Sequence, residues 1–193
     1  MRNIELENYL NSFGKQVVNR AKGGLQKAGK GGGYLENSIR FEVENHQDGK
    51  YDILFYMAPY GAFVDKGVSG AGGEIKGGDH KGTYSGLRDY KNYKKQRVPS
   101  PFRFGSGKGS GSIYKGIGSF IKKKGLQPRN EKGQYQTTVG LKIAIVKVLW
   151  TKGIQGISFF QKPLSLGLDQ FGDKILFGLK SDITDKIMST QKK

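Results

Sequence analysis

Apolar residues recur at steps of three and four near the start of the chain. This spacing places them on one face of a helix, with polar residues such as Glu7, Asn11 and Lys15 on the other. Glycines within residues 29–33 interrupt the pattern, so we expect one amphipathic helix that ends there. The apolar positions are Leu6, Leu10, Phe13, Val17, Ala21 and Leu25.

The period then changes from helical spacing to strict alternation. Apolar and polar residues alternate in two short runs, and turn-forming residues that include Asp48 and Gly49 separate the runs. Such a pattern predicts an antiparallel hairpin, one face of which packs on the first helix. The alternating apolar positions are Ile39, Phe41 and Val43 in the first run and Tyr51, Ile53, Phe55 and Met57 in the second.

Helical spacing returns in the second half of the chain, after a Gly-rich and Lys-rich segment. Val139, Ile143, Val146 and Trp150 fit one helical face, and the following Lys152-Gly153-Ile154 predicts a helix end with a left-handed glycine. Residues 117–128 resemble residues 145–156, so we expect the same helix stop to be used twice. A last amphipathic helix is predicted from Ile175, Leu179, Ile183 and Ile187.

These elements predict an α+β fold in one domain, residues 1–193. A small antiparallel sheet would be flanked by N-terminal, central and C-terminal helices, and residues 67–134 would form an extended basic loop or arm inserted after the hairpin. The glycine content of that segment is typical of a chain that is disordered when free and orders on contact with a partner.

Positive charge is concentrated in this same segment. The chain has a net charge of +17, and residues 65–134 contain sixteen lysines and arginines against five acids, a difference of +11. A field of this sign attracts polyanions or acidic protein surfaces. The chain contains neither an apolar signal segment at its N-terminus nor an apolar run of membrane-spanning length, so we expect a soluble protein without a membrane partner.

Residues for catalysis are scarce. The chain has no cysteine, and its two histidines, His46 and His80, have no neighbours at the spacing of a metal site or a catalytic triad. The acids are scattered along the sequence and do not form the pairs that hydrolytic or two-metal chemistry requires. We therefore expect no enzyme activity, no cofactor and no metal site.

Aromatic residues interleave with the basic ones between residues 84 and 120. Bases of single-stranded nucleic acid stack on such rings, but Tyr and Arg are also common anchors of protein interfaces. Both a stand-alone nucleic-acid-binding protein and a subunit contact remain open on this pattern. The candidate interaction residues are Lys91, Lys94, Lys95, Arg97, Arg103, Lys122, Lys123, Lys124 and Arg129.

The stretch that leads into the basic segment carries a family resemblance. Residues 58–67, APYGAFVDKG, resemble the Ala-x-Tyr-Ala-x-aromatic-Val-acid-x-Gly stretch of the tail-completion (neck or head-tail connector) proteins of tailed double-stranded DNA phages, with Gly61 where that family has Ala. Residues 152–164 resemble the Gly-Ile and aromatic pair before its last helix. The residues that match this scaffold motif are Tyr60, Phe63, Val64, Asp65, Gly67, Gly153, Phe159 and Phe160.

The resemblance implies a structural protein of the virion neck or tail, assembled in the host cytoplasm. Its subunits would form a homo-oligomeric ring, commonly a hexamer, between the portal or connector and the tail, in a tail-completion or tail-terminator role. The basic arm would contact double-stranded DNA in the lumen or a neighbouring subunit. Tyr60 and Phe63 would pack at the sheet edge, and Phe159 and Phe160 would seal the core.

Overall fold

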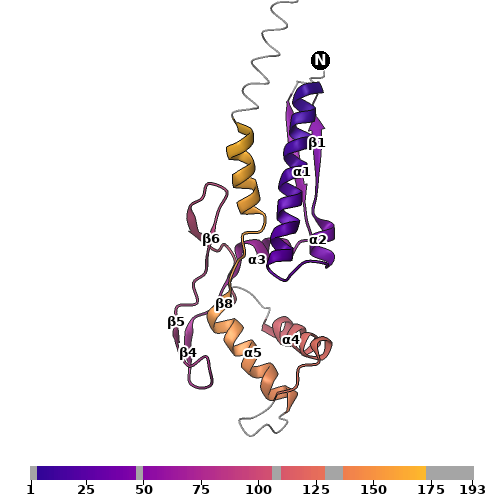
Figure 1. The fold of residues 1–193 in the computed structure, drawn as a ribbon. Coiled ribbons are helices and arrows are strands. Elements are labelled where there is room, and N and C mark those ends of the chain that lie inside the picture. The colour runs from indigo at the N-terminus through magenta and orange to yellow at the C-terminus, as the bar shows by residue number, and fades with distance from the viewer. Residues whose placement is uncertain (1–3, 47–49, 106–109, 129–136, 173–193) are drawn as a thin grey trace, which may run out of the picture. The chain divides into compact units, whose positions relative to one another are not determined.

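A computed structural model describes most of the chain, and its helices and strands are shown in Figure 1. Helices occur together with two-stranded sheets among the described residues, and the sheets with a defined register are antiparallel, so the predicted α+β class is confirmed. The described residues are 4–46, 50–105, 110–128 and 137–172.

The chain divides into two compact units, whereas the sequence pattern predicted a single domain with a loop. The boundaries fall directly after Asp65 and around the hairpin that follows residue 88. Unit 1 comprises Met1–Asp65, Lys91–Arg97 and Ile157–Lys193, and unit 2 comprises Lys66–Tyr90 and Val98–Gly156.

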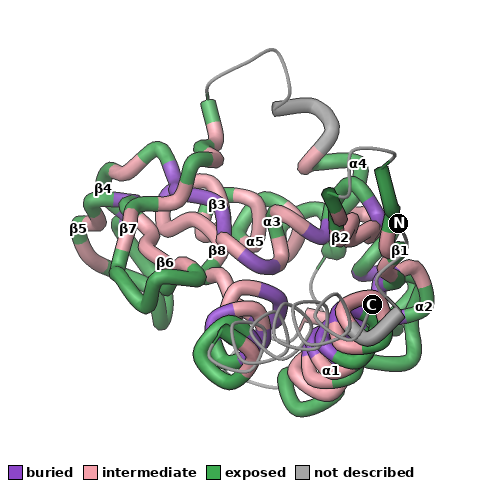
Figure 2. Tube along the Cα trace, turned by 90° about the horizontal axis from the view of Figure 1, so that it is seen from above, coloured by how far each residue is buried: buried purple, intermediate pink, exposed green. Residues whose placement is uncertain are grey.

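Unit 1 begins with the predicted amphipathic helix, α1 (Ile4–Lys27). Its buried positions include Phe13, Val17, Ala21 and Leu25, which follow the spacing of the sequence pattern. Figure 2 shows buried, intermediate and exposed residues along α1. The helix ends as a glycine-containing Schellman motif, in which the backbone N–H of Lys30 donates to the carbonyl of Leu25 at 2.9 Å. The short helix α2 (Tyr34–Ser38) follows.

The predicted hairpin is formed by β1 (Arg40–Asn45) and β2 (Tyr51–Tyr56). The strands are antiparallel, and their register pairs Phe41 with Phe55 and Val43 with Ile53. Phe41, Ile53 and Phe55 pack against the buried residues of α1, which confirms that one face of the hairpin covers the helix. The predicted turn residues Asp48 and Gly49 lie outside the described residues.

Aromatic rings connect the hairpin to the C-terminal part of unit 1. The ring of Phe55 meets the ring of Phe160 edge to face, with centroids 5.3 Å apart, and Phe13 meets Phe171 in the same way at 5.3 Å. Phe171 belongs to a helix that covers residues 161–172 up to the end of the described chain. The helix predicted from Ile175 to Ile187 lies outside the described residues.

Unit 2 contains regular structure where the sequence pattern predicted a long loop. Short strands and a helix occupy about half of the described part of residues 67–134, and the predicted central helix is also present as α5. The elements are β3 (Val68–Ser69), β4 (Gly73–Ile75), β5 (Gly82–Tyr84), α4 (Ser110–Lys124), α5 (Thr138–Lys152) and β8 (Gly153–Ile154). A further hairpin is formed by β6 (Asp89–Lys91) and β7 (Arg97–Pro99), whose residues are divided between the two units.

The glycines of unit 2 explain why composition was misleading. A Cβ atom on Gly86 would lie 2.6 Å from the carbonyl oxygen of Gly70, and one on Gly70 would overlap the carbonyl oxygen of Thr151. The backbone N–H of Gly70 donates to the carbonyl of Gly86 at 2.7 Å, so the chain segments pack backbone against backbone. Glycine permits this close approach, whereas the sequence pattern interpreted it as flexibility.

The two predicted helix stops differ in structure. Gly125 follows α4 with φ of +61°, and the N–H of Leu126 donates to the carbonyl of Ile121 at 3.1 Å, as in a Schellman motif. Gly153 follows α5 with φ of +79° but ψ of −176°, which is outside the left-handed helical region. The predicted helix end after Lys152 and a positive φ at Gly153 are therefore confirmed, but the predicted left-handed helical ψ is not, because the chain continues directly into β8, which pairs with β3.

Candidate functional site

The two segments that carry the family resemblance meet inside unit 1. Asp65 is 2% exposed and is near the end of the short helix α3 (Gly61–Lys66). Its Oδ1 accepts the backbone N–H of Phe160 at 2.7 Å and that of Gln161 at 3.3 Å. These are the first amides of the helix over residues 161–172, so the carboxylate acts as a cap supplied from a distant part of the sequence.

Backbone hydrogen bonds strengthen the same junction. The N–H of Ile157 donates to the carbonyl of Val64 at 3.1 Å, and the N–H of Ser158 donates to the carbonyl of Asp65 at 2.9 Å. Val64 also packs against the core of unit 1. The buried carboxylate and the two backbone hydrogen bonds together hold the end of α3 against the start of the C-terminal helix.

Two glycines of the motif lie in close contact with other residues. A Cβ atom on Gly61 would lie 2.7 Å from the Sδ of Met57 and 2.9 Å from a methyl carbon of Leu35, so Ala at this position would require these two flexible side chains to shift. Gly67, in unit 2, has φ of +74°, and a Cβ there would lie 2.5 Å from the nitrogen of Gly156. A side chain at Gly67 therefore conflicts with both the backbone conformation and the space.

The aromatic residues of the motif divide into two groups. Phe159 and Phe160 are 2% and 9% exposed and belong to the core of unit 1. Tyr60 and Phe63, which the resemblance placed at the sheet edge, are each 44% exposed and do not belong to this core. Both side chains are thus partly exposed at the surface of unit 1.

Four of the predicted interaction residues belong to the hairpin of β6 and β7. Lys91, Lys94, Lys95 and Arg97 are all exposed. The tip of this hairpin is built by Asn92, whose side-chain oxygen accepts the backbone N–H groups of Lys94 and of Gln96, each at 3.0 Å.

Two contacts dock this hairpin on the C-terminal helix of unit 1. The Nζ of Lys95 lies 2.6 Å from a carboxylate oxygen of Asp169, and the N–H of Tyr93 donates to the side chain of Gln161 at 3.0 Å. Lys95 is thus engaged within the chain, and its φ of +63° is unusual for a residue with a side chain. Lys91 and Lys94 remain exposed beside it.

The other predicted interaction residues that the structure describes lie in unit 2. Arg103 is exposed, and its backbone forms an isolated parallel β-bridge with the backbone of Ser69. Lys122, Lys123 and Lys124 occupy the last turn of α4, where positive charge is favourable next to the carbonyl end of the helix. Arg129 lies outside the described residues. The predicted cations therefore belong to two units.

Some of the interleaved aromatics already have partners within unit 2. Phe104 stacks on Trp150 with ring centroids 6.1 Å apart, and the Nζ of Lys152 lies 4.3 Å from the ring centre of Tyr84. Tyr114 and Phe120, on α4, are 37% and 46% exposed. Phe120 is the better candidate of these two for contact with another molecule, because Tyr114 meets Lys142.

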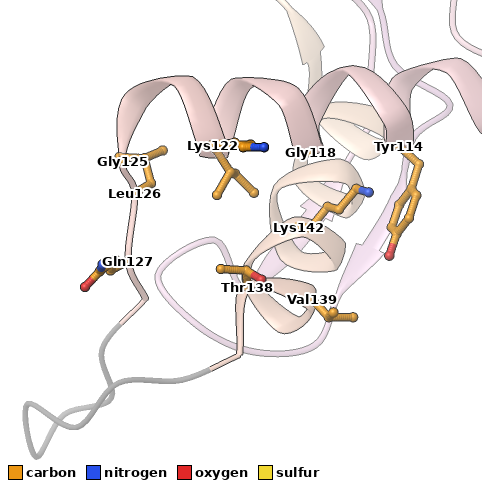
Figure 3. A pocket seen from close by; sticks show the side chains of 10 residues that line it. Tyr114, Gly118, Lys122, Gly125, Leu126, Gln127, Thr138, Val139 and Lys142 are labelled. Carbon is orange, nitrogen blue, oxygen red and sulfur yellow. The ribbon is translucent and has the colours of Figure 1, made fainter.

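Sequence reasoning missed a cavity between α4 and α5. Figure 3 shows Tyr114 and Lys142 entering it from the two helices, with Val139 at its edge. The Nζ of Lys142 lies 3.6 Å from the ring centre of Tyr114. The available signal was the composition of α5, whose apolar residues are not confined to one face: Val139 and Ile143 are 55% and 53% exposed.

Two kinds of feature are absent from the described residues. No cluster of three or more His, Cys, Asp or Glu side chains within them could hold a metal ion. Nor does any of their helices combine the length and apolar character needed to cross a membrane.

Comparisons with protein-family models, with curated proteins and with solved structures found no match to this chain.

Proposed function

We propose that this chain is a structural protein of a tailed-phage neck and that it assembles as a ring between the portal or connector and the tail. The observation that carries the proposal is the junction at Asp65. Residues 58–67 and 152–164 carry the resemblance, and they contribute the acceptor and the donor of one buried interaction, Asp65 to Phe160. Their association in space supports reading them as parts of one scaffold.

The arrangement also gives a physical reason for the long insertion. The hydrogen bonds of Val64 and Asp65 to Ile157, Ser158 and Phe160 bring the two ends of unit 1 together, so a second unit can be inserted between them. Unit 2 begins directly after Asp65 and ends directly before Ile157. In the proposed ring, the Asp65 junction maintains the scaffold while unit 2 supplies contacts to DNA or to neighbouring proteins.

Oligomeric state provides the first test. Size-exclusion chromatography with light scattering should show a ring-sized assembly of the full chain, either alone or after addition of the connector proteins encoded beside it. A protein that stays monomeric with those partners, and binds duplex DNA with affinity that falls steeply as salt rises, would instead support a stand-alone nucleic-acid-binding protein.

Particle assembly provides a second test. Replacing Lys122, Lys123 and Lys124 together with Glu should block completion of infectious particles while far-UV circular dichroism stays unchanged, because these side chains are exposed. The matched control replaces the exposed Lys30, Lys76 and Lys81 with Glu, which gives the same change in net charge at other surfaces. Normal particle yield from the first variant would argue against a neck role for this end of α4.

A further inference from the structure

The cavity between α4 and α5 has an apolar floor. Its volume is about 450 Å³, and among its lining residues Ile121 is 5% exposed whereas Leu126 and Val139 are 38% and 55% exposed. Apolar surface left open in a concave site is a common feature of binding grooves. A cavity of this size accepts apolar side chains that are projected from another molecule.

The helices that enclose this cavity carry charge of one sign only. Neither α4 nor α5 contains Asp or Glu, and seven lysines are distributed along them. Lys122 and Lys142 are among the residues that line the cavity itself. The seven are Lys115, Lys122, Lys123, Lys124, Lys142, Lys147 and Lys152.

One of these lysines is positioned by packing. The Nζ of Lys142 lies over the ring of Tyr114, and a Cβ atom on Gly118 would lie 2.9 Å from the same Nζ. The absence of a side chain at Gly118 therefore leaves room for the Lys142 ammonium beside α4. A cation held at the edge of an apolar groove is ready to meet a carboxylate without first losing much side-chain freedom.

We infer that the α4–α5 groove binds an acidic amphipathic helix of a partner protein. The apolar face of such a helix fills the groove around Ile121 and Val139, and acidic residues beside that face meet Lys122 and Lys142. A second copy of this groove is a poor occupant, because it would bring lysines against lysines. Duplex DNA is also a poor occupant, because a phosphate backbone offers nothing apolar to cover Val139.

The inference does not depend on the proposed ring. The groove and its charge are properties of unit 2, and binding of a peptide is measured without any particle. A peptide that fails to bind would leave ring formation open, and a chain that fails to form rings would leave peptide binding open.

The test uses the full chain and a fluorescent synthetic helix. The probe has leucines at positions i, i+3, i+4 and i+7 and glutamates on its other face, and fluorescence anisotropy reports binding. Three matched peptides carry Gln for each Glu, Lys for each Glu, or the same residues in scrambled order. The acidic amphipathic peptide should bind most tightly, and its affinity should fall as salt is raised.

Substitutions in the groove then locate the site. Val139→Asn should weaken binding about tenfold, because it removes an apolar contact from the interface. Lys142→Gln should weaken binding about threefold to tenfold at low salt and less at high salt. The matched controls, Ile143→Asn and Lys147→Gln, change similar residues of α5 that do not line the cavity, and binding should stay within about twofold.

Several outcomes would overturn the inference. No binding of the acidic peptide would contradict it, and so would equal binding of the four peptides. Equal effects of Val139→Asn and Ile143→Asn would place the binding site elsewhere. Binding of a short DNA duplex or of anionic lipid vesicles that depends on Val139 and Lys142, without peptide binding, would assign the groove to a different partner. Circular dichroism of each variant checks that its helices are retained.

Discussion

Asp65 and Phe160 are 95 residues apart in the sequence, and the carboxylate of the first accepts the backbone N–H of the second at 2.7 Å. Both residues are buried, at 2% and 9% exposure. The interaction closes unit 1, because it joins the end of α3 to the start of the C-terminal helix. It also uses the acid of the APYGAFVDKG stretch in a structural role.

Removing this carboxylate should destabilise unit 1. Asp65→Ala leaves the N–H groups of Phe160 and Gln161 without their acceptor, and a buried unsatisfied donor costs about 1–3 kcal/mol. Urea unfolding followed by far-UV circular dichroism measures the loss. Asp52→Ala is the control, because Asp52 pairs with His46 at the surface and an exposed pair contributes about 0–1 kcal/mol. Equal losses in the two variants would contradict the capping role of Asp65.

Two glycines of α1 should respond in opposite directions to the same substitution. A Cβ atom on Gly14 would overlap the ring of Phe41, whereas a Cβ on Gly23 would meet nothing within 4 Å. Gly14→Ala should therefore destabilise the protein by about 1–3 kcal/mol through overpacking. Gly23→Ala should stabilise it by about 0.5–1 kcal/mol, because alanine favours the helix. Urea midpoints that shift in the same direction would contradict the packing of α1 on β1.

Gly67 should tolerate no side chain. In Gly67→Ala, a residue with a Cβ atom has to adopt a positive φ, which costs about 1–2 kcal/mol. The new Cβ also clashes with the backbone of Gly156. Trp150 is the only tryptophan of the chain and lies in unit 2, so its fluorescence reports unfolding of that unit. Gly77→Ala is the control, since a Cβ there meets nothing within 4 Å. A Gly67→Ala midpoint equal to that of the control would show that this junction adapts freely.

Glu36 should make stability depend on pH. Its carboxylate accepts the backbone N–H of Gly32 and the side-chain N–H of Gln26, and these hydrogen bonds lower the pKa of Glu36 below its ordinary value of 4.5. A lowered pKa in the folded state means that the charged form stabilises the protein above pH 4.5. This stabilisation is lost as the pH falls further, through the pKa of the folded state.

The measurement for Glu36 is urea unfolding of the native chain and of Glu36→Gln across this pH range. The native chain should be more stable near neutral pH, and the difference should shrink below pH 4.5. Glu44→Gln, at an exposed position of β1, is the control. A difference between the native chain and Glu36→Gln that does not change with pH would contradict the role of the ionised carboxylate.

The elements of unit 1 were largely accessible from local pattern. The spacing from Leu10 to Leu25 predicted α1, and the alternation around Phe41 and Phe55 predicted the hairpin and the face that it buries. Both predictions succeed because a helix or a hairpin expresses its own period in adjacent residues. The helical assignment of α5 succeeded for a different reason, because the Lys152-Gly153-Ile154 sequence marks where the helix ends whereas its apolar residues are not confined to one face.

The organisation of unit 2 could not be obtained in this way. The sequence does not distinguish a glycine in a flexible linker from a glycine whose backbone lies against another backbone. Gly70 and Gly86 are of the second kind. Which of the two applies depends on neighbours far along the sequence, including Thr151. The composition of residues 67–134 was therefore interpreted as an arm, although much of that segment is folded.

The candidate interaction residues show the same division. Counting charges was sufficient to locate an excess of lysine and arginine after Asp65, because charge is a property of each residue alone. Folding distributed those cations between the β6–β7 hairpin and the end of α4, and it placed Lys142 over Tyr114 beside an open apolar cavity. Periods and charges are local and can be read along the chain. Caps such as Asp65, close backbone contacts and grooves arise from residues that meet only after the chain has folded.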